Sequence, residues 1–301
     1  MRTNLIARNL AAKSPRLQRW TENVTNPANR GHRLRALRKS MWYDLHTGRF
    51  KRPTVVRIGQ RSRIIAYPGE SNSPKAAYCN PPNWEMFVWA RRLHPGDLFV
   101  DIGANIGIYT IFALDLGAEV IAVEPTKNAD RVREHLTLNG YTAEVVQKAV
   151  TDHPGKVMIT DELDSLNHLV SDGSGIEVEA TTLDDLLGER TAAGVKIDVE
   201  GAERLVLAGA TRALSEQRIR LLQIEWDPSV SDENLGESRQ PLRELLERHG
   251  YRLYVDDQRG GLLPVDAEVP DVVNVFAAPR KVAVGTAQQA RGRNGPRLGS
   301  G

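Results

Sequence analysis

The pattern of apolar and polar residues along the chain changes near residue 97. Before that point, residues 1–50 show only weak helical periodicity. Residues 54–67 carry β-branched residues around a possible turn at Gly59-Gln60, which predicts a β-hairpin. Residues 68–83 are rich in Pro, Ser and Asn, so we expect a loop there, followed by a helix over residues 84–93.

From residue 97 onward, short apolar runs alternate with segments of helical periodicity. Strands are predicted over residues 98–102, 119–123, 144–150, 195–199, 219–224, 251–255 and 272–277, and helices over 106–116, 128–139, 202–214 and 242–249. Residues 156–160 and 176–180 predict an inserted hairpin or two short strands. This alternation is typical of βαβ units, and it predicts an α/β, Rossmann-like fold with a mostly parallel sheet.

Composition fits a soluble protein with a buried core, since 41% of the 301 residues are hydrophobic and 26% are charged. Cys79 is the single cysteine, which excludes an internal disulfide and favours a reducing compartment. Arg8 interrupts the apolar start of the chain, and no apolar run reaches the roughly 18–20 residues of a membrane span. We therefore expect a cytoplasmic protein without a membrane span.

Charge is distributed unevenly along the chain, although the formal net charge is only +2. The first 63 residues are rich in Arg and Lys and contain two acids, Glu22 and Asp44. The expected organisation is a basic arm with helices and a β-hairpin (1–83), a cofactor-binding domain (84–279) and a disordered tail (280–301). The arm either packs against the acidic body or contacts an anionic partner such as nucleic acid.

A glycine-containing loop follows the strand over residues 98–102 and is the strongest sign of a ligand site. Gly103 allows a sharp turn, and Gly107 lies at the start of the next helix. A dinucleotide loop requires G-x-G-x-x-G, but Asn105 takes the place of the middle glycine, and Asp101 would repel a phosphate. S-adenosylmethionine (SAM) carries a sulfonium and an ammonium group, whose positive charge suits Asp101.

Glu124 ends the second strand, about 20 residues after the loop, where an acid accepts hydrogen bonds from ribose hydroxyls. NAD would use the same acid, so Glu124 alone does not distinguish the two cofactors. The alternative is that Asp101 and Glu124 are solvated acids at strand ends. Their joint spacing with Gly103 and Gly107 favours a SAM site.

Seven segments between residues 85 and 226 occur in an order that is similar to one family. They are FVDIGANIGIYT, AVEP, LTLNG, KAVTD, TTLDDLL, VKIDVEGAE and LLQIEW. Together they resemble the FkbM-type methyltransferases, whereas residues 1–80 match nothing in that pattern. The resemblance implies a seven-stranded class I methyltransferase fold with an antiparallel last strand. It also implies SAM-dependent O-methylation of sugars, glycans, macrolides or other secondary metabolites.

The resemblance also implies which residues bind the cofactor. By position, the loop would line the methionine part of SAM, and Glu124 would hold the ribose. Ala149 and Val150 would lie beside the adenine. The loop residues concerned are Asp101, Gly103, Ala104, Asn105 and Gly107.

Transfer of a methyl group from a sulfonium to an alcohol needs an aligned hydroxyl oxygen and an acceptor for its proton. The candidate bases are Asp198, Glu200 and Glu225 at the ends of the fourth and fifth strands, and His168 in a loop. Lys196 and Asp198 share one face of their strand. Since a buried lysine needs a counter-ion, Asp198 has an alternative role in an ion pair that only shapes the site.

Neither a metal ion nor an adenine-methyltransferase motif changes the expected function. Several carboxylates converge, so Mg²⁺ could assist, but no His/Cys spacing for zinc exists and no metal ligand is assigned. The segment Asn80-Pro81-Pro82-Asn83 is similar to the N-P-P-aromatic motif of methyltransferases that act on adenine amino groups. It lacks the aromatic residue, and we interpret it as a loop that leads into the helix over 84–93.

The acceptor is expected to be a small molecule or a glycan. The alternative is an RNA-modifying methyltransferase that uses the basic arm. Single-stranded RNA binding favours aromatic residues among the basic ones, and the first 63 residues contain few: Trp20, Trp42, Tyr43 and Phe50. A SAM-binding scaffold without activity is the third possibility, and the intact DIGANIG and KIDVEGAE segments argue against it.

Overall fold

We describe the protein from a computed structural model, over residues 20–21, 23–68, 70, 76–77, 79–160, 175–226, 239–265, 269 and 272–281. Its strands are β1 (Thr54–Arg57), β2 (Arg63–Ala66), β3 (Leu98–Ile102), β4 (Glu119–Val123), β5 (Glu144–Val146), β6 (Ala149–Val150), β7 (Gly155–Ile159), β8 (Ile176–Thr181), β9 (Gly194–Ile197), β10 (Leu222–Glu225), β11 (Tyr251–Asp256), β12 (Leu262–Pro264) and β13 (Asn274–Pro279). Its helices are η1 (Pro27–Asn29), α3 (Arg33–Phe50), α5 (Met86–Ala90), α6 (Ile108–Asp115), α7 (Asn128–Asn139), α8 (Leu183–Leu187), α9 (Glu203–Ala208), α10 (Thr211–Ser215) and α12 (Gln240–Arg248).

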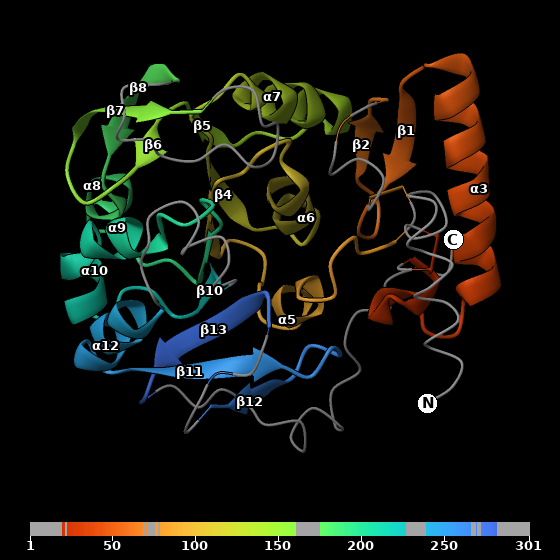
Figure 1. Cartoon of the computed structure of the whole chain (residues 1–301). Helices are drawn as coiled ribbons and strands as arrows, with labels where there is room; N and C mark the ends of the chain where they lie inside the picture. The colour runs from red at the N-terminus through yellow and green to blue at the C-terminus, as the bar shows by residue number, and fades with distance from the viewer. Residues whose placement is uncertain are drawn as a thin grey trace.

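A central sheet runs through the molecule in the strand order β12-β11-β13-β10-β9-β3-β4-β5 (Figure 1). The pairs from β10 to β5 are parallel, and β13 lies antiparallel between β10 and β11. The predicted Rossmann-like fold with an antiparallel last strand is therefore confirmed. The described sheet has one strand more than expected, the short edge strand β12, which follows Gly260 and Gly261 and ends at Pro264.

Two apolar cores cover the two faces of this sheet, because successive side chains of a strand point to opposite faces. Phe99 packs with α5, α6 and α7 on one face, while its neighbour Val100 packs with α8, α9, α10 and α12 on the other. In β13, Phe276 packs in the same core as Phe99, and its neighbour Val275 packs in the same core as Val100. Figure 1 shows α8, α9, α10 and α12 together at the left of the sheet.

The predicted strand over residues 144–150 is wrong in its second half. β5 ends at Val146, and Ala149 and Val150 form β6, which pairs with β8 in a separate three-stranded sheet with β7. The backbone amide of Glu124 donates to the carbonyl of Val146, after which the chain leaves the edge of the central sheet. Periodicity cannot detect this change of partner, because both pieces are apolar.

The predicted helix over residues 202–214 is divided into α9 and α10 at Gly209. A Cβ on Gly209 would lie 2.1 Å from the carbonyl oxygen of Thr151, so the close approach of these two segments requires glycine. The helix predicted from residue 106 begins at Ile108 instead, because Gly107 has a left-handed φ of 82° and caps it. The helix predicted over 84–93 is shorter, and residues 33–50 form one helix rather than loose ones.

The predicted hairpin is present, and its packing is continuous with the cofactor-binding domain across the boundary predicted at residue 83. Ile58 and Ile64 lie in the same core as Phe112 of α6. Helix α3 lies outside the hairpin at the right of Figure 1 and contributes Tyr43 to that core. The predicted tail beyond residue 281 lies outside the described residues. No helix in the described ranges has the length and apolar character to cross a membrane.

Candidate functional site

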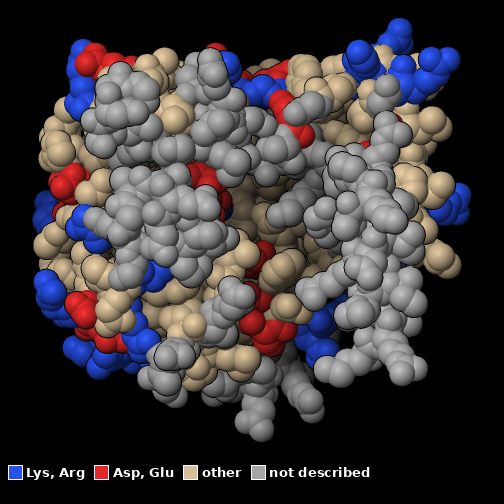
Figure 2. All heavy atoms as spheres, viewed as in Figure 1, with Lys and Arg blue, Asp and Glu red and all other residues tan. Residues whose placement is uncertain are grey.

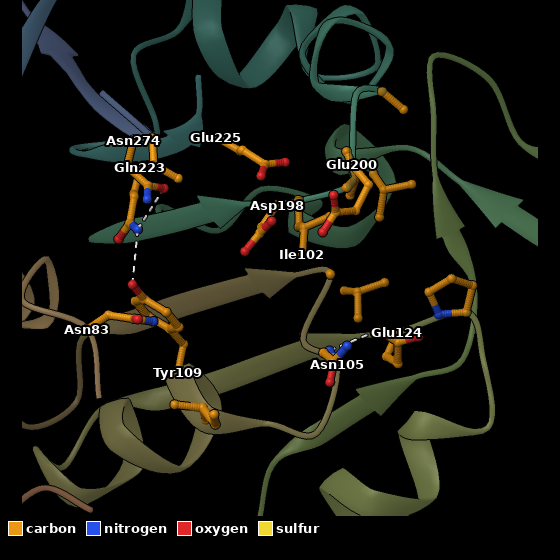
Figure 3. A pocket seen from close by; sticks show the side chains of 18 of the residues that line it. Asn83, Ile102, Asn105, Tyr109, Glu124, Asp198, Glu200, Gln223, Glu225 and Asn274 are labelled. Atoms are coloured by element: carbon orange, nitrogen blue, oxygen red, sulfur yellow. Dashed lines mark hydrogen bonds between the residues drawn. The ribbon is translucent and has the colours of Figure 1, made fainter. Parts of the chain in front are cut away.

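A pocket opens at the carboxyl ends of β3, β4, β9 and β10, where parallel α/β sheets bind their ligands (Figure 3). The segment before α5 and the start of β13 close it on one side. Eight of the predicted site residues line this pocket: Gly103, Asn105, Glu124, Ala149, Val150, Asp198, Glu200 and Glu225. The sheet topology therefore brings together residues that are far apart in the sequence.

The glycine loop after β3 is fixed by a very close approach to the end of β9. Gly103 has a φ of 74°, and a Cβ there would lie 1.8 Å from the carbonyl oxygen of Asp198. The backbone amides of Gly103 and Ala104 both donate to the carbonyl of Val123 at 3.0 Å. A side chain at position 103 would push apart the two strand ends that frame the pocket.

Glu124 connects the glycine loop to the segment after β4. Its Oε2 accepts from the backbone amide of Asn105 at 2.8 Å, and its Oε1 accepts from the backbone amide and hydroxyl of Thr126 at 3.0 and 2.6 Å. Asn105 holds a left-handed φ of 51°, which turns its amide toward Glu124. A carboxylate oxygen can accept two hydrogen bonds, so Oε2 of Glu124 can accept a further one from a ligand in the pocket.

Lys196 lies beneath the pocket between two carboxylates. Its Nζ is 2.9 Å from Oδ2 of Asp198 and 3.8 Å from Oδ1 of Asp101, its cross-strand neighbour in β3. It also lies 4.8 Å from the centre of the Tyr109 ring. The predicted Lys196–Asp198 ion pair is therefore confirmed, and Asp101 shares it.

Burial and neighbouring charges shift the pKa values of Lys196 and Asp101 in opposite directions. Burial lowers the pKa of Lys196, but the attraction of Asp198 and Asp101 outweighs burial, so its pKa is raised. Burial raises the pKa of Asp101, while Lys196 and the hydrogen bond from Thr110 oppose that rise. Asp101 is fully buried, so its charge acts on the site through Lys196.

Asp198, Glu200 and Glu225 bring three carboxylates to one point of the pocket. One oxygen from each lies within 4.8 Å of the others. Figure 3 shows Asp198 and Glu225 directed into the space between the glycine loop and β10. Burial raises the pKa of Glu225 to about 10, and the neighbouring carboxylates of Asp198, Glu200 and Glu203 add to the effect.

A polar wall closes the end of the pocket away from Glu124. The Nε2 of Gln223 donates to the hydroxyl of Tyr109 and to Oδ1 of Asn274, both at 3.1 Å. The indole of Trp89 donates to Oε1 of Gln223 at 2.6 Å, and Asn83 bonds the hydroxyl of Tyr109. Burial raises the pKa of Tyr109, so this hydroxyl stays protonated. These groups form a pre-ordered set of donors and acceptors (Figure 3).

Known proteins with similar sequences identify the family. The methyltransferase FkbM domain matches residues 101–253, which include the glycine loop, Glu124 and all three carboxylates. The chain belongs to the FkbM methyltransferase family. It is also 29% identical over 204 residues to the 31-O-demethyl-FK506 methyltransferase FkbM of Streptomyces tacrolimicus, covering 54% of this chain and 76% of that protein.

Solved methyltransferase structures are also similar to this FkbM methyltransferase, at low identity. The precorrin-6y C5,15-methyltransferase of Geobacter metallireducens is 15% identical with a TM-score of 0.37, covering 66% of this chain and 88% of that one. The magnesium protoporphyrin IX methyltransferase of Synechocystis, with bound SAM, is 13% identical with a TM-score of 0.38, covering 65% and 76%.

The cofactor of this FkbM methyltransferase is SAM, and the charge of the pocket fits it. The described residues that line the pocket include five acids but only one basic residue, Lys148. A pyrophosphate would be repelled by such a wall, whereas the cationic SAM is attracted. Figure 2 shows acidic side chains inside the central hollow, while Lys and Arg gather at the upper right, over the end of α3.

Not every predicted site residue reaches the wall of this pocket. Asp101 is buried beneath Lys196. Gly107 packs against Val132 of α7, and Ala104 is directed into the core. These three residues therefore support the glycine loop from its core side, and their contact with SAM stays a prediction. His168 lies outside the described residues.

The polar wall was not predicted from the sequence. Gln223 is a fully buried polar residue within the apolar run LLQIEW, and it shares a strand face with Glu225 two residues later. Asn274 likewise interrupts the apolar run VVNVFAA. A polar side chain inside a buried strand needs a hydrogen-bond partner, so these interruptions were a usable signal. Tyr109 and Asn83 carried no such signal.

Proposed function

We propose that this FkbM methyltransferase is an O-methyltransferase that acts on a hydroxyl of a sugar, a glycan or another secondary metabolite. The observation that carries the proposal is the group of three carboxylates at the ends of β9 and β10. They lie between the cofactor-binding loop and the polar wall. The name of the Streptomyces relative, an O-demethyl-FK506 methyltransferase, supports an oxygen acceptor.

Bound SAM supplies a methyl group on a positively charged sulfur. Under this proposal Glu124 holds the ribose, and the loop around Gly103 and Asn105 holds the methionine part. The acceptor oxygen gains the methyl group and loses its proton, and the carbon–sulfur bond breaks. Asp198, Glu200 and Glu225 lie beside that oxygen, and Asp198 is our first candidate for the proton acceptor because its side chain is part-exposed to the pocket. Glu225 is the weakest candidate, since its pKa of about 10 means that it already carries a proton near neutral pH.

The polar wall supports an acceptor that carries several oxygens. Gln223 donates one amide proton to Tyr109 and the other to Asn274, and the oxygens of Tyr109 and Asn274 keep further lone pairs for a ligand. Such a wall suits hydroxyl groups better than a flat apolar ring. A glycan or a polyhydroxylated metabolite would therefore be oriented by these groups with one hydroxyl directed to the carboxylates.

The test is transfer from isotope-labelled SAM to a panel of sugars, glycans, macrolides and extracted metabolites, with total RNA as a separate arm. We expect a mass shift in a hydroxylated metabolite and none in RNA. Methylation of RNA alone would contradict the proposal and point to the basic arm as a nucleic-acid-binding segment.

A further inference from the structure

The three carboxylates of Asp198, Glu200 and Glu225 come from one short region of the sheet edge. Asp198 follows β9 directly, and Glu225 is the last residue of the adjacent strand β10. Glu200 lies in the turn after Asp198, with a left-handed φ of 54°. This turn directs its carboxylate back to the other two, so that one oxygen of each lies within 4.8 Å of the others.

A second observation distinguishes this group from an ordinary acidic cluster. Glu225 is only 9% exposed, and its Oε2 is buried without any hydrogen-bond partner. Figure 3 shows this carboxylate directed into the pocket, toward Asp198 and Glu200. Buried polar atoms are nearly always bonded, so an unpartnered carboxylate oxygen at a pocket wall indicates that a ligand completes it.

Two cations near the group also bind carboxylates outside it, within the part of the chain that the structure describes. Lys196 is shared between Asp198 and the fully buried Asp101. Arg239, 2.7 Å from Glu203, forms an ion pair with that carboxylate just outside the group. The pocket wall is richer in acids than in bases over the described residues, and it would attract a positively charged ligand.

We propose that Asp198, Glu200 and Glu225 bind one divalent cation of the Mg²⁺ or Mn²⁺ type. The donor set consists of carboxylate oxygens alone, which hard cations prefer over zinc or copper. Carboxylates from the ends of two adjacent strands can occupy one side of such an ion and leave its other positions to water or to a ligand.

The consequence concerns the acceptor, and it rests on the proposed function. A cation with open positions binds best to two neighbouring oxygens of one molecule. It also makes a bound hydroxyl more acidic, so that its proton is released to a carboxylate or to water. The preferred acceptor would then carry vicinal oxygens, as in a diol of a sugar or a hydroxyketone. The methylated oxygen would be one of that pair.

The experiment measures Mn²⁺ binding to the full chain by electron paramagnetic resonance, in the presence of S-adenosylhomocysteine. We expect one bound Mn²⁺ in the wild type and an affinity at least about tenfold weaker in Glu225→Gln, which removes one carboxylate ligand. The matched control is Glu119→Gln, an exposed glutamate at the opposite end of the sheet, which should bind Mn²⁺ like the wild type. Glu200→Gln serves as the second site variant if Glu225→Gln does not fold.

Absence of Mn²⁺ binding at millimolar concentration would overturn the cation site, as would unchanged affinity in both site variants. This result is independent of the proposed function, because no acceptor is present. O-methylation that persists in EDTA, together with no Mn²⁺ binding, rejects the cation and leaves the proposed function intact. Mn²⁺ binding with transfer only to nitrogen or carbon rejects the proposed function and leaves the cation site intact.

Discussion

Lys196 is the residue around which the charges of the site are arranged. It keeps Asp101 and Asp198 close together, one beneath the pocket and one at its wall. A buried lysine without a counter-ion is unfavourable, so the sequence needs at least one of these acids for folding. Because Asp101 shares the pairing with Lys196, Asp198 does not carry that role alone and is available for chemistry.

A substitution at Asp198 tests this division of roles. Asp198→Asn keeps the size of the side chain but removes its charge, and we expect turnover to fall by roughly 10²–10⁴-fold. The free energy of unfolding should fall by only about 1–3 kcal/mol, since Asp198 is part-exposed and Lys196 keeps Asp101 as a partner. Urea unfolding and turnover measured on one sample check both values. Full turnover in a folded Asp198→Asn protein would move the proton acceptor to Glu200.

Glu124 has two roles that a single substitution would remove together. It orders Asn105 and Thr126 through hydrogen bonds, and we propose that it holds the ribose. Glu124→Ala should weaken SAM binding by about 30–150-fold, equivalent to about 2–3 kcal/mol, through loss of charge-assisted hydrogen bonds. Calorimetry gives the dissociation constant, with Glu119→Gln as the control. A dissociation constant equal to that of the wild type would place Glu124 outside the site.

At the scale of elements, one side chain, Asp115, holds the turn of the β1–β2 hairpin against the domain. Asp115, at the end of α6, accepts hydrogen bonds from the backbone amides of Gln60, Arg61 and Ser62 and from the hydroxyl of Ser62. Tyr67 and His135 add further contacts between the hairpin segment and α7. The hairpin is therefore held by hydrogen bonds as well as by the apolar contacts of Ile58 and Ile64.

Removal of this anchor should destabilise the whole domain. Asp115→Ala leaves three backbone amides without their acceptor, and we expect a loss of about 2–4 kcal/mol in the free energy of unfolding. Asp152→Ala, in an exposed turn, is the control and should change stability by less than about 0.5 kcal/mol. Equal midpoints of urea unfolding in the two variants would show that the hairpin is not coupled to the core.

Much of the element pattern could be predicted from the sequence, and the failures have physical causes. The strands 98–102 and 119–123 and the helix 128–139 match β3, β4 and α7 residue for residue, because their apolar periodicity is strong and Gly140 ends the helix. The split of residues 144–150 and the break at Gly209 depend on contacts with distant segments, which local periodicity does not contain.

At the scale of the whole molecule, the site follows from the order of the parallel strands. Spacing in the sequence was sufficient to predict the glycine loop, Glu124 and the carboxylates as one site, since parallel strands end at the same edge. The burial of Asp101 behind Lys196 and the wall formed by Tyr109, Gln223 and Asn274 depend on cross-strand register and on packing. The burial of Asp101 and the polar wall could therefore not be predicted from the sequence of any one strand.

We propose that this pocket transfers a methyl group from SAM to oxygen. The most direct measurement is a reaction with ¹³C-methyl-labelled SAM, followed by NMR of the product to identify the atom that carries the labelled methyl group. We expect an O-methyl signal on a hydroxylated acceptor, made by the wild type and nearly absent with Asp198→Asn. A labelled methyl group on nitrogen, carbon or RNA, or equal product from both proteins, would contradict it.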